Sequence, residues 1–291
     1  MGKLVRVISN DGAVLATALD STDMVYRAER IHESSATVTA ATGRMLTAAS
    51  MMGAALKNDN DTITLRISGN GPAGPITAVS DARGNAKVTV MNPIVEIPLN
   101  DKGKLDVSGA VGKDGFLSVV RDSGKGEPQS GYCPIITGEI GEDVTNYFVV
   151  SEQIPTVCAL GVLVSPDLTV AAAGGYLIQL LPGADDSCID KIESNISDIP
   201  PVSSMIKDKM TPEMILERVL DGFELEVIEE IDVEYRCDCS KDRAVRAIIS
   251  LGNEELTKIA SEQDITTVEC HFCENNYTFT AQELLELCNK D

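Results

Sequence analysis

Four cysteines near the C-terminus are the residues of this chain whose types and spacing could do chemistry. They form two close pairs, Cys237-Asp238-Cys239 and Cys270-His271-Phe272-Cys273, with thirty residues between them. Such pairs can either oxidise to disulfides or hold one Zn²⁺ together, and tetrahedral Zn–S bonds of about 2.3 Å would place the sulfurs roughly 3.8 Å apart. The pattern predicts a zinc site with the ligands Cys237, Cys239, Cys270 and Cys273.

The two pairs differ in how easily they can hold a metal. A C-x-x-C turn brings its sulfurs together readily, whereas alternate side chains of an extended C-x-C segment lie about 6–7 Å apart. A purely structural zinc is the simplest interpretation. A redox role also fits, because Zn²⁺ keeps the sulfurs as thiolates, the form that oxidants attack, and each pair is close enough to form a disulfide.

The chain offers few other residues for chemistry, and we assign no catalytic residue. The segment Gly69-x-Gly71-x-x-Gly74 matches a dinucleotide-binding motif, but Pro72 and Pro75 exclude the helix that should follow, so we interpret it as a β-turn. His271 could ligate a metal, although four thiolates already complete a tetrahedron. The remaining thiols lack a close partner in sequence and are expected to be small buried hydrophobic residues: Cys133, Cys158, Cys188 and Cys288.

Composition limits the partners and the location. The chain has 291 residues, enough for about two domains, and its formal net charge of −21 is concentrated after residue 183. Such an acidic segment repels phosphate groups, so no nucleic-acid partner is expected. No secretory signal is visible, and the longest apolar run, Val157 to Val164, is too short to cross a bilayer. We therefore expect a cytoplasmic protein without a membrane partner, whose cysteines are kept reduced.

Residues 1–183 are expected to form a mixed α/β domain. A segment rich in Ala, Met and Thr predicts a helix over 35–57, in which Gly43 and Gly53 permit the close approach of neighbours. Period-two alternation predicts a first hairpin and further strands over residues 4–8, 13–19, 62–67, 75–80 and 86–91.

Residues 184–230 indicate a helical linker. Isoleucines recur at helical spacing from Ile189 to Ile199 within an acidic and polar stretch, and Pro200-Pro201 ends this helix. Thr211-Pro212-Glu213 then provides an N-cap, a proline at the first helical position and an acid that favours the helix dipole. The narrow apolar seams of these helices must be buried against another part of the protein.

Residues 231–291 are expected to form a small C-terminal zinc-binding domain. Ser240 and Asn253 can begin helices, and Thr280-x-x-Glu283 is a capping box for a last helix. A predicted hairpin over 266–270 and 277–279 carries the C-x-x-C at its turn. Because a unit of this size has a marginal core, a stabilising metal is physically motivated. The predicted fold class is α+β, with a mixed α/β N-terminal domain, a helical linker and this small domain.

The cysteine spacing resembles that of the redox-regulated thirty-three-kilodalton chaperonin family of heat-shock holdases. Other segments resemble blocks of that family in the same order, and together they span nearly the whole chain. These segments are 69–74 (GNGPAG), 111–115 (VGKDG), 147–153 (YFVVSEQ) and 172–183 (AAGGYLIQLLPG).

The resemblance implies a bacterial cytosolic holdase that acts without ATP and without chemical turnover. It implies that the reduced protein binds one Zn²⁺ per chain and is inactive. It also implies that oxidation pairs Cys237 with Cys239 and Cys270 with Cys273, releases the metal and disorders the linker and the zinc domain. The exposed surfaces would then bind unfolding client proteins under oxidative stress, with a homodimer favoured on activation.

Two other function classes are alternatives. A zinc-dependent thiol–disulfide oxidoreductase would place its C-x-x-C at a helix N-terminus in a thioredoxin-like context, whereas Cys273 is followed by a turn and a strand. A zinc-dependent nucleic-acid module is opposed by the acidic C-terminal third.

Overall fold

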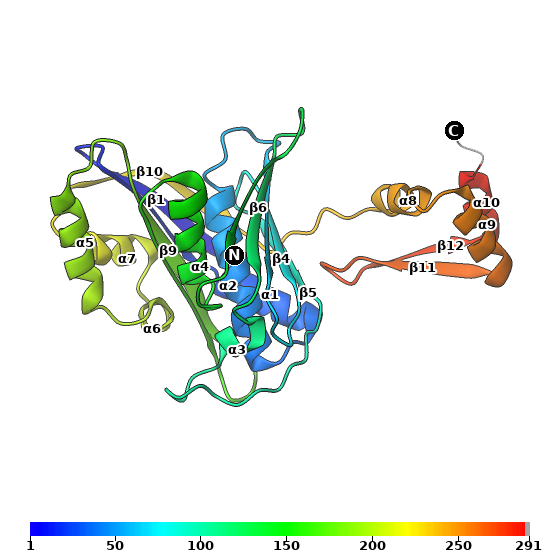
Figure 1. Cartoon of the computed structure of the whole chain (residues 1–291), viewed down its shortest axis with the longest axis horizontal. Coiled ribbons are helices and arrows are strands. Elements are labelled where there is room, and N and C mark those ends of the chain that lie inside the picture. Colours follow the sequence, from blue (N-terminus) through cyan, green and yellow to red (C-terminus); the bar gives the residue numbers. More distant parts are fainter. Residues whose placement is uncertain (289–291) are drawn as a thin grey trace. The chain divides into compact units, whose positions relative to one another are not determined.

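In the computed structural model, which describes residues 1–288, helix α2 (Ala36–Gly53) lies buried between two antiparallel sheets (Figure 1). Its glycines allow this packing, because a Cβ added to Gly43 would lie 2.6 Å from Cγ1 of Val25, and one added to Gly53 would lie 2.2 Å from Oγ of Ser80. A helix that is apolar on all sides belongs in a protein interior. The predicted helix over 35–57 is thus confirmed as the central element of the first unit.

The two sheets flank α2 on opposite sides. Sheet A has the strand order β10-β1-β2-β9-β8, and sheet B has the order β5-β4-β3-β6-β7. The strands of sheet A are β1 (Gly2–Ser9), β2 (Val14–Asp20), β8 (Thr156–Val164), β9 (Val170–Leu180) and β10 (Leu225–Val233). Those of sheet B are β3 (Thr62–Ser68), β4 (Ile76–Asp81), β5 (Ala86–Val90), β6 (Phe116–Asp122) and β7 (Gln129–Pro134). The pairing of β1 with β2 confirms the predicted hairpin, and β3, β4 and β5 confirm the three predicted strands.

Shorter helices accompany α2 and the two sheets in the first unit. They are α1 (Thr22–His32), α3 (Val107–Val111) and α4 (Gly141–Tyr147), which continues into a π-helical turn at Phe148–Glu152. Among the helices of residues 1–288, none is long and apolar enough to cross a membrane.

The glycine-rich segment 69–74 is a turn packed against the segment that follows α3. The N–H of Gly74 donates to the carbonyl of Gly71 at 3.2 Å, which confirms the predicted β-turn. The N–H of Gly71 donates to the carbonyl of Val111 at 2.9 Å, and a Cβ added to Gly71 would lie 2.3 Å from the carbonyl oxygen of Ala110. The close approach of two backbones explains these glycines.

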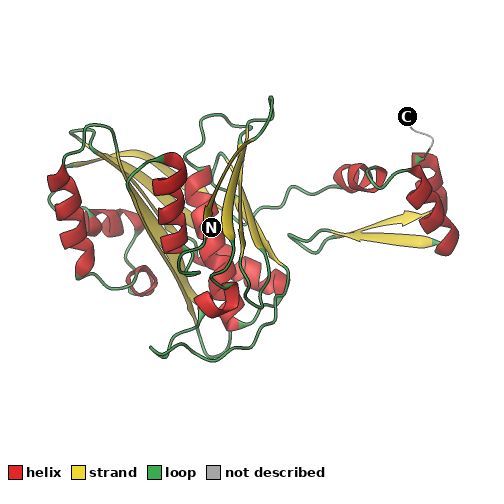
Figure 2. Ribbon diagram, viewed as in Figure 1, coloured by secondary structure: helices red, strands yellow, loops and turns green. Residues whose placement is uncertain are grey.

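Three helices cover the face of sheet A that points away from α2 (Figure 2). They are α5 (Asp186–Ser197), α6 (Val202–Lys207) and α7 (Pro212–Val219). Ile192, Ile215 and Leu216 from these helices are buried in one apolar cluster with the strands of sheet A. The predicted cap is present, since Oγ1 of Thr211 accepts from the N–H of Met214 at 3.4 Å. The seams predicted for residues 184–230 therefore rest on sheet A.

The strand β10 returns the chain from these helices to the edge of sheet A. It pairs with β1 from Ser9 opposite Leu225 to Gly2 opposite Val233. The chain divides into compact units between Arg236 and Cys237. Residues 231–236 of the predicted C-terminal segment therefore lie in the first unit: Ile231–Val233 belong to β10, and Tyr235 forms a bridge with Ala86 of β5 in sheet B. The alternation of Val227, Ile231, Val233 and Tyr235 predicts a strand here, but such a pattern does not identify its pairing partner. Residues 289–291 of that segment lie outside the described residues.

The second unit combines a hairpin with helices around a small core. Its elements are α8 (Lys241–Ile249), α9 (Asn253–Glu262), β11 (Ile265–Glu269), β12 (Asn276–Thr280) and α10 (Ala281–Leu287). The capping box is confirmed, because Oγ1 of Thr280 accepts from the N–H of Glu283 at 3.2 Å, while the Glu283 carboxylate accepts from the N–H of Thr280 at 2.8 Å. The pairing of β11 with β12 confirms the predicted hairpin.

Candidate metal centre

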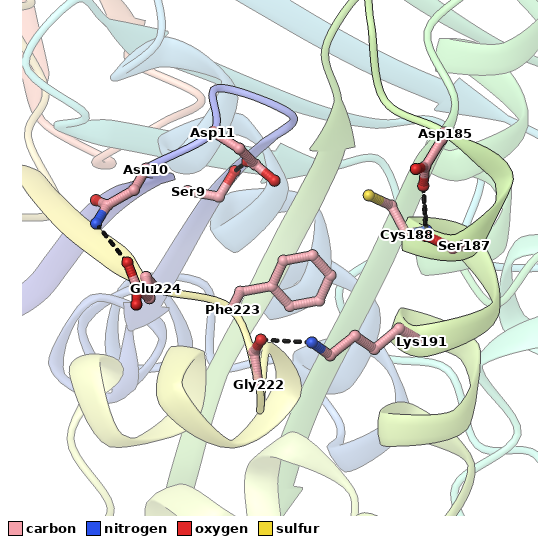
Figure 3. A pocket seen from close by; sticks show the side chains of 10 residues that line it. All are labelled: Ser9, Asn10, Asp11, Asp185, Ser187, Cys188, Lys191, Gly222, Phe223 and Glu224. Carbon is pink, nitrogen blue, oxygen red and sulfur yellow. Dashed lines mark hydrogen bonds between the residues drawn. The ribbon is translucent and has the colours of Figure 1, made fainter.

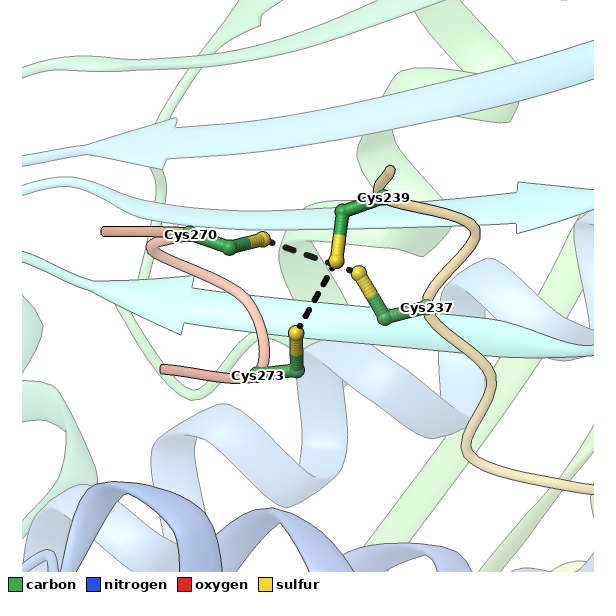
Figure 4. Close-up of side chains that lie close together, drawn as sticks. All are labelled: Cys237, Cys239, Cys270 and Cys273. Atoms are coloured by element: carbon green, nitrogen blue, oxygen red, sulfur yellow. Dashed lines mark hydrogen bonds between the residues drawn. The ribbon is translucent and has the colours of Figure 1, made fainter. Parts of the chain in front are cut away.

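The four predicted ligands form one sulfur cluster in the second unit. The Sγ atoms of Cys237, Cys239, Cys270 and Cys273 all lie within 4.8 Å of one another (Figure 4). The shortest contacts cross between the pairs, at 3.7 Å from Cys237 to Cys270 and 3.3 Å from Cys239 to Cys273. These distances are close to the edge of roughly 3.8 Å expected for a ZnS₄ tetrahedron. All four residues are free thiols.

The C-x-x-C half lies in the turn between β11 and β12. The N–H groups of Cys273 and Glu274 both donate to the carbonyl of Cys270, at 3.2 and 2.8 Å. Glu274 has a φ of 58°, in the left-handed region, so that the chain can turn back into β12. This tight turn points both sulfurs to one side. It leads into a strand rather than a helix, which is not the thioredoxin-like arrangement that an oxidoreductase needs.

The C-x-C half leaves the extended form that would keep its sulfurs apart. Residues 236–240 have no regular secondary structure, so the separation of about 6–7 Å expected along a strand does not apply. Asp238, between the two cysteines, forms an ion pair with Arg243 of α8 at 2.5 Å. Ser240 caps α8 by accepting from the N–H of Arg243 at 3.3 Å. The start of α8 therefore fixes the geometry of this half.

Contacts away from the sulfurs also join the two halves. Nζ of Lys241, in the first turn of α8, lies 2.9 Å from the Glu283 carboxylate of the α10 cap. The same Nζ lies 5.1 Å from the centre of the Phe279 ring. Both charged groups are about half exposed, so this ion pair adds little stability on its own.

Two side-chain donors lie against the sulfur cluster, and both point at the same sulfur. The hydroxyl of Tyr277, on β12, donates to Sγ of Cys239 at 3.1 Å. Nδ2 of Asn275 lies 3.9 Å from the same sulfur.

The thiols of the cluster ionise unequally. Burial opposes ionisation of Cys239, but hydrogen bonds from Tyr277 and the neighbouring thiols outweigh it and lower the pKa of Cys239 to about 7. Burial raises the pKa of Cys237 to about 11 and raises the pKa of Cys273 further above its ordinary value. Because metal ligands must be thiolates, a divalent cation would supply the attraction that ionises the remaining sulfurs.

The donor set fits zinc. Four sulfurs at tetrahedral spacing select Zn²⁺ over the hard cations, which take oxygen ligands. His271 is exposed and is not a member of the cluster. A site closed by four protein ligands leaves no position for a substrate, which is the arrangement of structural rather than catalytic zinc.

The other cysteines lie elsewhere. Cys133 and Cys158 are buried in the first unit, as predicted for small hydrophobic residues, and burial raises the pKa of Cys158 to about 12. Cys188 of α5 and Cys288 are only partly buried, contrary to the prediction, because each lies at the edge of an apolar cluster, Cys188 beside sheet A and Cys288 beside the core of the second unit.

A polar cavity of about 330 Å³ lies in the first unit, where α5 meets the loops before β2 and β10 (Figure 3). Lys191 of α5 crosses this space, since its Nζ donates to the carbonyl of Gly222 and lies 4.5 Å from the centre of the Phe223 ring. Asn10 donates to the Glu224 carboxylate at 3.2 Å. The contacts of Lys191 anchor α5 to the segment before β10, and that of Asn10 joins the two loops.

The cysteine spacing identifies the four sulfurs but not the side chains that surround them. Period-two alternation places Tyr277 and Phe279 on one face of β12, yet only the structure shows that Tyr277 reaches a sulfur while Phe279 enters the core. The pairing of Asp238 with Arg243 follows the spacing of a capped helix start, a weak signal that could have suggested it.

Comparison with known proteins gives one consistent result. A family model described as Hsp33 protein matches residues 2–280. A 33 kDa chaperonin from Geobacillus sp. (strain WCH70) is 46% identical over 284 residues, which cover 98% of this chain and 96% of that protein. A 33 kDa chaperonin from Clostridium beijerinckii is 43% identical over 287 residues, 99% of this chain and 98% of that protein. The crystal structure of a 33 kDa chaperonin (HSP33) from Thermotoga maritima superposes with a TM-score of 0.90 at 35% identity, covering 98% of this chain and 97% of that one.

Proposed function

The chain belongs to the Hsp33 family of chaperones, and from this premise we propose that it is a redox-regulated, ATP-independent holdase that binds unfolding proteins under oxidative stress. The observation that carries the proposal is the single cluster of four free thiols, drawn from two pairs that meet across the second unit. The protein performs no chemical turnover in this account.

In the reduced state, Cys237, Cys239, Cys270 and Cys273 would hold one Zn²⁺, which keeps the four sulfurs together as thiolates. The support for this role is the all-sulfur donor set and its spacing. The metal would join the start of α8 to the β11–β12 hairpin, and these two segments otherwise share mainly a small core.

Oxidation would replace this shared site with two separate bonds, Cys237 to Cys239 and Cys270 to Cys273. One thiolate of a pair attacks a hydroperoxide, so that an S–O bond forms and the O–O bond breaks. The second thiolate then displaces hydroxide from the sulfenic sulfur, and the pair of sulfurs loses two electrons in total. Because each disulfide lies within one half, neither holds the halves together, and the metal loses its ligands.

Loss of the metal would unfold the second unit and loosen the helical linker, residues 184–230, from the domain of residues 1–183. Sheet A supplies the surface that this exposes, because α5, α6 and α7 cover an apolar face of it. Client proteins would bind there, and activation would favour a homodimer. The strongly acidic linker and C-terminal unit argue against nucleic acid as a partner. We place the protein in the cytoplasm, where its thiols start reduced.

The proposal is tested by peroxide with mild heat applied to the reduced, zinc-loaded protein. About one zinc per chain should be released as suppression of client aggregation appears, without ATP, and peptide mapping should find both disulfides within the pairs. The variant Cys188→Ser, which removes a thiol outside the cluster, should behave like the wild type. If the reduced, zinc-loaded protein suppresses aggregation equally well, the switch does not exist.

A further inference from the structure

We propose that Tyr277 is a positioning residue of the metal centre: its hydroxyl holds Cys239 by an O–H···S hydrogen bond and makes that sulfur the slowest of the four to react with electrophiles. The inference rests on the zinc site proposed above. It assigns a role to a residue that ligates nothing and that cysteine spacing alone does not reveal.

The geometry gives Tyr277 a fixed position. Its backbone pairs with Val268 across the hairpin, and its ring packs against the apolar core of the second unit. From this anchored ring the hydroxyl reaches Sγ of Cys239 at 3.1 Å. A side chain placed by both strand register and core packing loses little freedom when it forms this bond.

This hydrogen bond distinguishes Cys239 from Cys237 and Cys273, whose sulfurs accept hydrogen bonds from the backbone. Sγ of Cys237 accepts a hydrogen bond from the backbone N–H of Cys239, and Sγ of Cys273 accepts one from the backbone N–H of Asn275. Cys239 instead receives a phenol hydroxyl, with Nδ2 of Asn275 3.9 Å away. Cys239 therefore has a side-chain hydroxyl as its donor, whereas Cys237 in the same half and Cys273 in the other half have backbone donors.

A hydrogen bond to a thiolate has two physical consequences. It stabilises the charged sulfur, and it withdraws electron density that the sulfur would otherwise use as a nucleophile. Removal of an outer hydrogen-bond partner of a metal ligand typically lowers metal affinity 10- to 100-fold. Because Tyr277 is half-buried and water can partly replace its hydroxyl, we expect the low end of that range, about 10-fold.

The test uses the full chain with the substitution Tyr277→Phe, which keeps the ring and removes the hydroxyl. Tyr132→Phe is the matched control, because Tyr132 is 70% exposed on β7 of the first unit and its ring contacts Phe116. Three quantities are measured: zinc affinity by competition with a chromophoric chelator, the thiolate-to-metal charge-transfer bands of the Co²⁺-loaded protein, and alkylation by iodoacetamide at each cysteine.

In the zinc-loaded wild type, Cys239 should be the slowest of the four to displace iodide from the reagent. Tyr277→Phe should lower zinc affinity about 10-fold, shift the Co²⁺ charge-transfer bands to lower energy, and speed alkylation of Cys239 more than that of Cys270. Tyr132→Phe should change none of these. The shift of the bands separates a hydrogen bond from packing, since both variants retain their rings.

Two results would overturn the inference. One is a wild type in which Cys239 is alkylated as fast as the other three cysteines, a measurement that needs no variant to fold. The other is a Tyr277→Phe protein with unchanged bands and unchanged zinc affinity. Failure of the proposed function looks different, because then the wild type itself would not retain one zinc per chain.

Discussion

The two units of this chain are stabilised in different ways. The first unit places α2 between two sheets and adds linker helices on the far side of sheet A, so that both α2 and sheet A have apolar neighbours on both faces. The second unit buries a short set of side chains: Ala244, Ile248, Leu256, Phe279, Leu284 and Leu287. The contrast teaches that one part of a protein can be stable through packing while another depends on a bound ion.

The magnitudes support this division. Structural zinc contributes an apparent free energy on the order of 10–16 kcal/mol in small domains. The whole stability of an ordinary domain is about 5–15 kcal/mol. A metal bound by Cys237, Cys239, Cys270 and Cys273 would therefore outweigh the small core around it, whereas the first unit needs no such contribution.

The largest expected effect comes from removal of one ligand. Cys270→Ser should abolish tight zinc binding and unfold residues 237–288, because the metal would lose one of four thiolates and the unit its main source of stability. Limited proteolysis should cut the second unit and spare α2. The control Cys188→Ser should leave zinc content and proteolysis unchanged. A Cys270→Ser protein that is as resistant as the wild type would mean that packing alone holds the second unit.

Truncation of a side chain in the small core of the second unit should destabilise it less than loss of a zinc ligand, and bound zinc should keep the unit folded. Phe279→Ala should cost about 3–5 kcal/mol, yet the zinc-loaded unit should stay folded because zinc binding exceeds that cost. Apparent zinc affinity should fall by roughly 10²- to 10⁴-fold, as folding and binding are coupled. Leu285→Ala, at a position that is 44% exposed on the following helix α10, is the control. Equal zinc affinities for the two variants would separate the metal site from the core.

Apolar packing should stabilise the first unit in the way that the metal stabilises the second unit. Ile215 of α7 is fully buried against sheet A, and Ile215→Ala should cost about 2–5 kcal/mol and loosen the linker helices. The reduced, zinc-loaded variant should then suppress client aggregation in part. Met214→Ala, next to it but 47% exposed, should not. If the Ile215 variant loosens and gains no client binding, the surface under α7 is not the client site.

The smallest expected effect concerns the cap that links α10 to α8. The N–H of Thr280 and the charge of Lys241 lower the pKa of Glu283 to about 2. Because its folded pKa lies below the ordinary value of about 4.3, its contribution is present above that pH and is lost as pH falls toward 2. Glu283→Gln should therefore melt at a slightly lower temperature, by the same amount at pH 6 and pH 8. A difference that grows between those two pH values would point to another group.

Local signals in the sequence were enough to predict much of this structure. The alternation of residues 62–67, the cap at Thr211 and the capping box at Thr280 each depend on a few neighbouring residues, and each is confirmed. The four cysteines could be grouped because tetrahedral zinc has a small set of ligand spacings, and the structure brings the sulfurs together.

Features that depend on distant partners could not be predicted in this way. Helix α1 was not predicted; it packs against α2, a contact that no local pattern specifies. Likewise, nothing within β10 shows that it pairs with β1, whose residues lie more than two hundred positions earlier. The contact of Tyr277 with Cys239 has the same origin, because it depends on how the hairpin meets the segment before α8.

The most direct test of the account is hydrogen–deuterium exchange of the full chain, before and after peroxide, with released zinc measured in the same samples. We expect amides of residues 237–288 to lose protection in step with zinc release, those of α5 to α7 to follow, and those of α2 to stay protected. Continued protection of residues 237–288 after the zinc has left would contradict the claim that the metal, rather than the core, holds the second unit together.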